Sequence, residues 1–161
     1  MGTEELVFDD GATAAILLPQ ELERIWAEHL RGEFETKDVE GTLDTMVEDA
    51  SVLHIPTGTG GRGKAELRAF YQNDFIPGWP DDVQMTPVNR VVAAGQLVDE
   101  LRMTFTHKVP MPWFLPGVAP TGKPLTVDFV VVVQFRGDKL ACERIYWDHA
   151  SVLRQAGLLK Q

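Results

Sequence analysis

The chain has 161 residues, of which 44% are hydrophobic and 24% are charged, as is typical of a globular domain and not of a disordered or fibrous one. The formal net charge of -9 disfavours nucleic acid as a partner, because an acidic surface repels a phosphate backbone. The single cysteine, Cys142, excludes an internal disulfide and a cysteine-rich zinc site.

Two features concern the location of the protein. The N-terminal sequence MGTEELVFDD is acidic and has no basic segment followed by an apolar run, so we expect no signal peptide. The apolar run at residues 127–133 is far shorter than a bilayer span. We therefore expect a cytoplasmic protein with no membrane partner.

Helical patterns dominate the first part of the chain. Residues 1–18 are expected to form a loose N-terminal arm, followed by a single domain over residues 19–161. Asp38 is a suitable N-cap for a second, short helix, whose apolar face would contain Leu43, Met46 and Val47. The first helix follows Pro19 and is predicted from apolar residues at helical spacing, namely Leu22, Ile25, Trp26, His29 and Leu30.

A strand, a glycine-rich run and a third helix come next. Residues 51–55 predict a short strand, residues 57–63 a loop and residues 64–74 a helix. The run from Gly58 to Lys64 matches the first seven positions of a phosphate-binding P-loop. Because Ala65 replaces the Ser or Thr that would bind Mg²⁺, we interpret the run as a flexible loop and keep nucleotide binding only as a minor alternative.

The second half of the chain predicts a meander of strands and a final helix. Residues 110–124 form a proline-rich excursion whose aromatic residues must be buried, either as a lid or as a dimer contact. A turn is predicted at Gly95-Gln96. The predicted strands and the final helix cover residues 88–94, 97–109, 125–135, 139–147 and 150–159, respectively. We predict an α+β fold in which N-terminal helices pack on a curved antiparallel sheet.

Three segments carry a resemblance to a known family. They are Asp49–His54 in the first strand, Gly63–Tyr71 in the third helix and Asp138–Trp147 in the last strand. In this order they resemble the NTF2-like superfamily, in particular its SnoaL-like polyketide cyclases and ketosteroid isomerases, over residues 20–157. The closing stretch, residues 145–153, is similar to a branch sometimes attached to dienelactone hydrolases. The resemblance implies a cone-shaped α+β barrel around an apolar pocket, and a homodimer.

The resemblance also assigns expected roles to individual residues. His54 falls at the position of the general-base carboxylate of the steroid isomerases, and an imidazole with a pKa of about 6.5 can act as a base near neutral pH. Trp147 falls on the tryptophan that lines the isomerase pocket. The oxyanion-hole tyrosine has no counterpart, since Trp26 or Leu30 stands there, and Val131 replaces the protonated aspartate. Steroid isomerisation itself is therefore not expected.

Strand alternation selects two carboxylates that face the same side as apolar residues. Asp99 and His107 share a face with Leu101 in the long strand, and Glu143 shares a face with Trp147 in the last strand. A buried carboxylate needs a partner, so His54, Asp99 and Glu143 are the candidate catalytic set. Each also has a structural alternative: His54 as a packed histidine, Asp99 as a solvated turn residue and Glu143 in a surface ion pair.

The remaining assignments follow from residue type. Asp148 is expected to cap the last helix, and His107 to be a strand-end residue. Four histidines without the i, i+4 pairing of a helical zinc motif lead us to expect no metal and no cofactor. The predicted substrate-binding residues, which otherwise form core, are Trp26, Leu30, Phe70, Met103, Phe105, Trp113, Val131 and Trp147.

Our first hypothesis is a cofactor-independent acid–base enzyme, an isomerase, cyclase or dehydratase, that acts on an apolar carbonyl-bearing or polycyclic molecule. His54 would be the base, and Asp99 or Glu143 its acid or orienting partner. The alternative is a non-catalytic ligand-binding or interaction module of the same fold. In either case we expect a small apolar ligand and a homodimer formed through the sheet.

Overall fold

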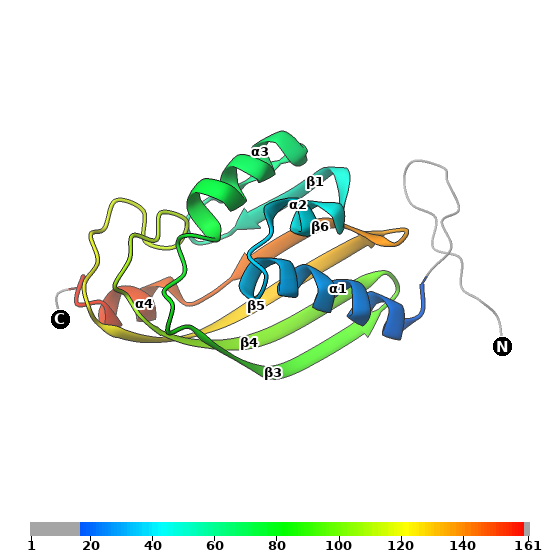
Figure 1. Cartoon of the computed structure of the whole chain (residues 1–161). Coiled ribbons are helices and arrows are strands. Elements are labelled where there is room, and N and C mark those ends of the chain that lie inside the picture. The colour runs from blue at the N-terminus through cyan, green and yellow to red at the C-terminus, as the bar shows by residue number, and fades with distance from the viewer. Residues whose placement is uncertain (1–16, 160–161) are drawn as a thin grey trace.

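The computed structural model describes residues 17–159 of the chain (Figure 1). The expected N-terminal arm therefore lies almost entirely outside the described residues. The described part is a single α+β unit, in agreement with the predicted fold class. None of its helices is long and apolar enough to cross a membrane.

Six strands form one curved sheet, in the order β2-β1-β6-β5-β4-β3. All neighbouring strands are antiparallel except β1 and β6, which run parallel, so the expectation of a wholly antiparallel sheet is corrected to a mixed one. The strands are β1 (Met46–His54), β2 (Thr59–Arg62), β3 (Gln84–Ala93), β4 (Gln96–Thr106), β5 (Pro124–Arg136) and β6 (Lys139–Tyr146).

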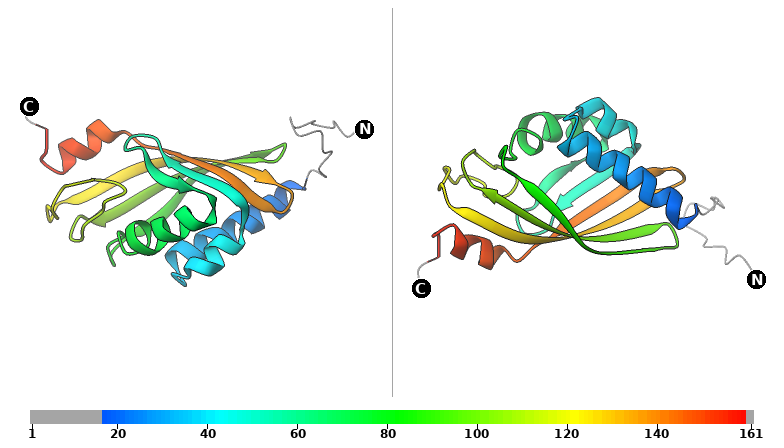
Figure 2. Two further views of the ribbon diagram at one scale, coloured as in Figure 1. Left: turned by 90° about the horizontal axis from the view of Figure 1, so that it is seen from above. Right: turned by 60° about the horizontal axis from the view of Figure 1, so that its bottom comes forward.

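The helices α1, α2 and α3 lie together on one face of the sheet, whereas α4 lies at one end of it (Figure 2). Their bounds are α1 (Pro19–Phe34), α2 (Val39–Asp44), α3 (Gly63–Phe70) and α4 (His149–Gln155), and a π-helical turn (Tyr71–Phe75) extends α3. Asp38 caps α2 as predicted, because its carboxylate accepts a hydrogen bond from the Gly41 amide at 3.0 Å.

Two predicted elements need correction. The glycine-rich run is not a flexible loop, since Thr59–Arg62 pairs with β1 as an antiparallel edge strand. The second helix is shorter than predicted, and Met46 and Val47 begin β1 instead of ending a helix. Both corrections have one cause: pairing between strands can extend a segment whose local sequence gives a weak strand pattern.

The alternation predicted for the long strand is confirmed in β4. Buried and less buried residues alternate along the whole strand, and Asp99 lies on the same buried face as Leu101, Met103 and Phe105. This face of β4 looks toward the helices. The inner face of the sheet and the buried stripe of α1 therefore enclose a core region that also contains buried polar residues.

Candidate functional site

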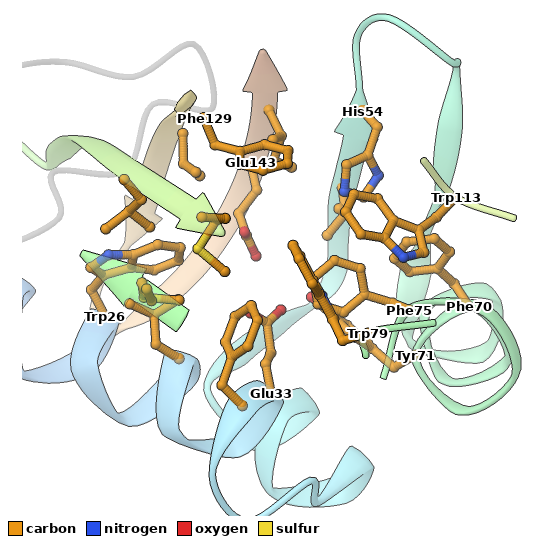
Figure 3. A pocket seen from close by; sticks show the side chains of 18 residues that line it. Trp26, Glu33, His54, Phe70, Tyr71, Phe75, Trp79, Trp113, Phe129 and Glu143 are labelled. Atoms are coloured by element: carbon orange, nitrogen blue, oxygen red, sulfur yellow. The ribbon is translucent and has the colours of Figure 1, made fainter. Parts of the chain in front are cut away.

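A cavity of about 50 Å³ lies between α1, the π-helical turn and the inner face of the sheet. Its wall is almost entirely apolar, with His54, Glu33, Glu143 and Tyr71 as the exceptions that carry ionisable groups (Figure 3). Six of the eight predicted substrate-binding residues line it: Trp26, Leu30, Phe70, Met103, Trp113 and Val131.

His54 ends β1 and is 2% exposed. Its Nδ1 lies 3.2 Å from the carbonyl oxygen of Thr59, and because a carbonyl can only accept, Nδ1 carries the proton. The Nε2 atom of the neutral ring is then a free acceptor. Aromatic rings surround the imidazole, with Trp113 at a centroid distance of 5.0 Å and Phe70 at 5.5 Å. A neutral imidazole with an unprotonated nitrogen in an apolar wall can accept a proton from a bound ligand, and burial makes it a weaker base than a free histidine.

Burial lowers the pKa of His54 to about 4. The folded protein therefore binds a proton at this ring less readily than the unfolded chain, whose histidine pKa is about 6.5. The folded protein keeps its full stability with respect to His54 above about pH 6.5. This stability is lost as the pH falls toward 4, because the unfolded chain then binds the proton more readily. We expect the unfolding free energy to fall by about 2 kcal/mol because of His54 when the pH is lowered from about 7 to about 5.

Urea denaturation of the wild type and of His54→Gln at both pH values checks this expectation. The wild type should lose more stability on acidification than the variant, because only the wild type must keep this ring unprotonated. Equal losses in the two proteins would show that His54 titrates normally in the folded state.

A cluster of one histidine and two carboxyl groups lies beside the cavity. Glu33 on α1 and Glu143 on β6 both line the cavity, and their carboxyl groups point toward one another (Figure 3). His29 Nε2 lies 3.1 Å from Glu33 Oε1 and 3.0 Å from Glu143 Oε1. On the other side of its ring, His29 Nδ1 lies 2.7 Å from the hydroxyl oxygen of Thr45. These buried contacts join α1 to the sheet.

The ionisable groups of this cluster shift one another's pKa values. Burial lowers the pKa of His29, but the carboxylates of Glu143 and Glu33 outweigh burial and raise it to about 10. Burial raises the pKa of Glu33, and it also raises that of Tyr71, whose hydroxyl lies 3.5 Å from His29 Nε2. The raised pKa of His29 favours the imidazolium and the raised pKa of Glu33 favours its neutral carboxyl form, which limits the net charge buried in the cluster.

Asp99 lies on the inner face as predicted but not in the wall of the cavity. Its carboxylate accepts hydrogen bonds from both Arg90 Nε and Nη2, at 3.0 and 2.8 Å, and from the Trp26 indole at 2.7 Å. The expected alternative, a solvated turn residue, is also not what the structure shows, since Asp99 is 1% exposed. Through Trp26, Asp99 positions part of the cavity wall.

Phe105 and Trp147 pack behind the wall instead of lining it. The ring of Phe105 meets the ring of Trp79 edge-on, with the ring centroids 5.4 Å apart. The ring centroids of Trp147 and His54 are 5.9 Å apart. Asp148 caps α4 as predicted, accepting from the Ser151 amide at 3.0 Å. These positions support the core without bordering the space itself.

The proline-rich excursion covers one end of the cavity. Trp113 lines the cavity and is fixed through its backbone, because the hydroxyls of Thr57 and Thr59 donate to its carbonyl oxygen at 2.9 and 2.7 Å. Thr59 thereby holds both Trp113 and, through its own carbonyl, the ring of His54. The excursion buries its aromatic residues inside its own chain.

Several residues of the site were not predicted from the sequence. Glu33 and His29 were not in the candidate set, although their i, i+4 spacing puts both on the buried stripe of α1. A charged residue on an otherwise apolar helix face was the available signal. The missed apolar residues of the wall include Phe75, Trp79 and Phe129.

The family model of the SnoaL-like domain matches residues 26–143, a segment that contains both His54 and Glu143. The chain belongs to the SnoaL-like domain family. No curated protein matches this SnoaL-like chain at a significant level.

Solved structures agree with this SnoaL-like assignment at the level of the fold. A proposed SnoaL-like polyketide cyclase from Jannaschia sp. CCS1 has 16% identity and a TM-score of 0.73, covering 92% of this chain and 100% of its own. AclR from Streptomyces galilaeus, a proposed hydroxylase, has 15% identity and a TM-score of 0.67, with 89% of each chain covered. A ketosteroid isomerase-like fold from Catenulispora acidiphila, in complex with trimethylamine, has 16% identity and a TM-score of 0.62, covering 84% and 93%.

Proposed function

We propose that this SnoaL-like protein is an acid–base enzyme that moves a proton next to the carbonyl group of a small apolar molecule. The observation that carries the proposal is the pairing of β1 with β6, in which Val52 lies opposite Glu143 and His54 opposite Ile145. The imidazole of His54 and the carboxyl group of Glu143 therefore project from neighbouring strands into the same apolar cavity. Isomerisation, aldol-type cyclisation and dehydration all need such a pair of polar groups.

His54 is the proposed base. Its Nε2 would take the proton from the carbon next to the carbonyl, and the aromatic wall would exclude water from the reacting atoms. The carbonyl oxygen would lie at the opposite end, beside Glu33 and Glu143. There the cluster shares protons between an imidazole and two carboxyl groups, and a shared proton can hydrogen-bond the oxygen as negative charge develops on it.

The size of the cavity restricts the substrate. A volume of about 50 Å³ holds a few atoms beyond a water molecule, so a small carbonyl compound fits more readily than a polycyclic one. Trp113, which lines the cavity, is held in place by the two threonine hydroxyls that bond its carbonyl oxygen.

A panel of small apolar ketones and enones in D₂O tests the proposal. The expected result is catalysed exchange of the proton next to the carbonyl, followed by proton NMR. Ligands that bind without any exchange would instead support the alternative of a non-catalytic binding module, which the apolar wall alone could serve.

We also propose that the chain forms a homodimer through the outer face of the sheet. This face, opposite the helices α1–α3, exposes Leu53, Val91, Val130 and Tyr146 (Figure 2). Val130 and Tyr146 are direct cross-strand partners in its centre. Adjacent exposed apolar side chains on a sheet face are typical of a protein interface.

Val130→Glu is expected to convert the dimer to a monomer, because it places a charge in the centre of the proposed interface. Light scattering coupled to size exclusion measures the mass. Leu18→Glu is the matched control, since Leu18 is exposed but lies at the start of α1 in the helical layer. A monomeric wild type, or a Val130→Glu protein of unchanged mass, would contradict the proposed interface.

A further inference from the structure

We propose that His29, Glu33 and Glu143 form a binding site for one divalent first-row transition cation, with Mn²⁺ and Zn²⁺ as its probes. This site was not expected from the sequence. It goes beyond the proposed function, because cation binding is measured without a substrate. Three neighbouring ionisable groups alone would not indicate a metal site. The site is indicated by the spacing of the donor atoms and by a buried carboxylate oxygen that accepts no hydrogen bond.

The donor atoms have the spacing of a coordination sphere. His29 Nε2 lies 3.0 Å from Glu143 Oε1 and 3.1 Å from Glu33 Oε1, and donor atoms of all three residues lie within 4.8 Å of one another. With metal bonds of about 2.1 Å, adjacent donors lie about 3.0 Å apart in an octahedral site and about 3.4 Å apart in a tetrahedral one. The two spacings from His29 Nε2 match the octahedral arrangement.

Glu143 supplies the independent observation. Its Oε1 atom is inaccessible to solvent and accepts no hydrogen bond from any group in residues 17–159, although Glu143 is a 4% exposed residue facing His29. The 3.0 Å approach to His29 Nε2 is therefore a close contact outside hydrogen-bond geometry. A carboxylate oxygen buried without a hydrogen bond is costly even beside His29, and a cation bonded to all three groups would satisfy it.

The ring of His29 is held as a metal ligand would be. The Thr45 hydroxyl donates its hydrogen to the Thr42 carbonyl at 2.6 Å, so its oxygen can only accept from His29 Nδ1, 2.7 Å away. This fixes one proton on Nδ1, so the imidazolium proton that a cation would displace is the one on Nε2. A hydrogen bond to the distal ring nitrogen is the usual outer-shell support of a histidine ligand. Trp26 stacks on the ring at 5.5 Å and keeps its plane fixed.

The donor set selects the class of cation. One imidazole and two carboxylates suit Mn²⁺, Fe²⁺ and Zn²⁺, and none of the three offers a thiolate for softer ions. Because Glu33 and Glu143 also line the cavity, the remaining coordination positions would open toward a ligand there. A cation so placed would polarise a carbonyl oxygen of that ligand.

Isothermal titration of chelator-treated protein with MnCl₂ and with ZnCl₂ tests the site. We expect one cation per chain for the wild type, and at least about tenfold weaker binding for both Glu143→Gln and Thr45→Val, which change a ligand and its outer-shell support. Asp128→Asn is the control, because Asp128 is a carboxylate on the outer face, paired with Arg102, and its variant should bind as the wild type does.

Crystals soaked in MnCl₂ give a readout that does not depend on the folding of a variant. The anomalous peak of the cation is expected among His29 Nε2, Glu33 and Glu143. A peak elsewhere, no saturable binding of either cation at millimolar concentration, or equal affinity in Glu143→Gln would overturn the site. None of these outcomes bears on His54, so the proposed proton transfer stands or fails by its own assay.

Discussion

Replacing His54 by glutamine is expected to lower the rate of proton exchange next to a ketone carbonyl by about 10²–10⁴-fold, the usual contribution of a general base. Glutamine keeps a polar side chain of similar reach but has no nitrogen that can take a proton. The effect should fall on kcat, because the ring acts on the transferred proton and the apolar wall supplies most of the binding.

His107→Gln is the matched control. His107 is another buried histidine, but it does not line the cavity, and its Nδ1 accepts a hydrogen bond from the Thr121 amide at 3.2 Å. This variant should retain the wild-type exchange rate per folded molecule. If His54→Gln and His107→Gln slow exchange equally, His54 has only a structural role.

Replacing Arg90 by alanine is expected to cost about 3 kcal/mol of unfolding free energy, at the lower end of the range for breaking a buried ion pair. Asp99 is 1% exposed, so losing the guanidinium leaves a buried carboxylate with only the Trp26 indole as a partner. The expected loss of unfolding free energy lies at the low end of the range because 29% of the Arg90 side chain is exposed, so solvent already screens part of the ion pair.

Arg102→Ala provides a closely matched comparison for that measurement. Arg102 makes the same two-pronged contact across two strands, with Asp128 at 2.7 and 2.8 Å, but its side chain is 51% exposed and that of Asp128 is 46% exposed. Solvent screens such a surface pair, so it contributes little to stability. Urea denaturation of both variants should separate them clearly. Equal losses would mean that burial of Asp99 does not determine the strength of its pair.

Much of the site could be predicted because strand alternation is a local property. The side-chain period of two placed Glu143 on an inner face before any pairing was known, whereas the family resemblance pointed to His54, and both line the cavity. The same rule placed Asp99 inward, and its burial confirms that orientation.

The partner of Asp99 could not be predicted because it depends on the register of a hairpin. A turn at Gly95-Gln96 would pair Arg90 with Leu101. The turn is in fact at Ala94-Gly95, where both residues have positive φ, and this places Arg90 opposite Asp99. Asp99 was predicted to act as the acid or orienting partner of His54. Because the turn lies one residue earlier than predicted, Asp99 instead forms a buried ion pair with Arg90.

The polar cluster was missed for a different reason. His29 and Glu33 lie one turn apart on α1, which the helical pattern could indicate, but their neighbour Glu143 comes from β6. Only the packing of the helix on the sheet brings the three together. Sequence periodicity gives the face of each element and not the position at which two faces meet.

The most direct measurement is a crystal structure of the protein with the ketone that exchanges fastest. We expect the ligand inside the cavity, with the carbon that loses its proton next to His54 Nε2 and the carbonyl oxygen at the Glu33 and Glu143 end. A ligand bound outside the cavity, or one whose exchanging carbon lies away from the imidazole, would contradict it.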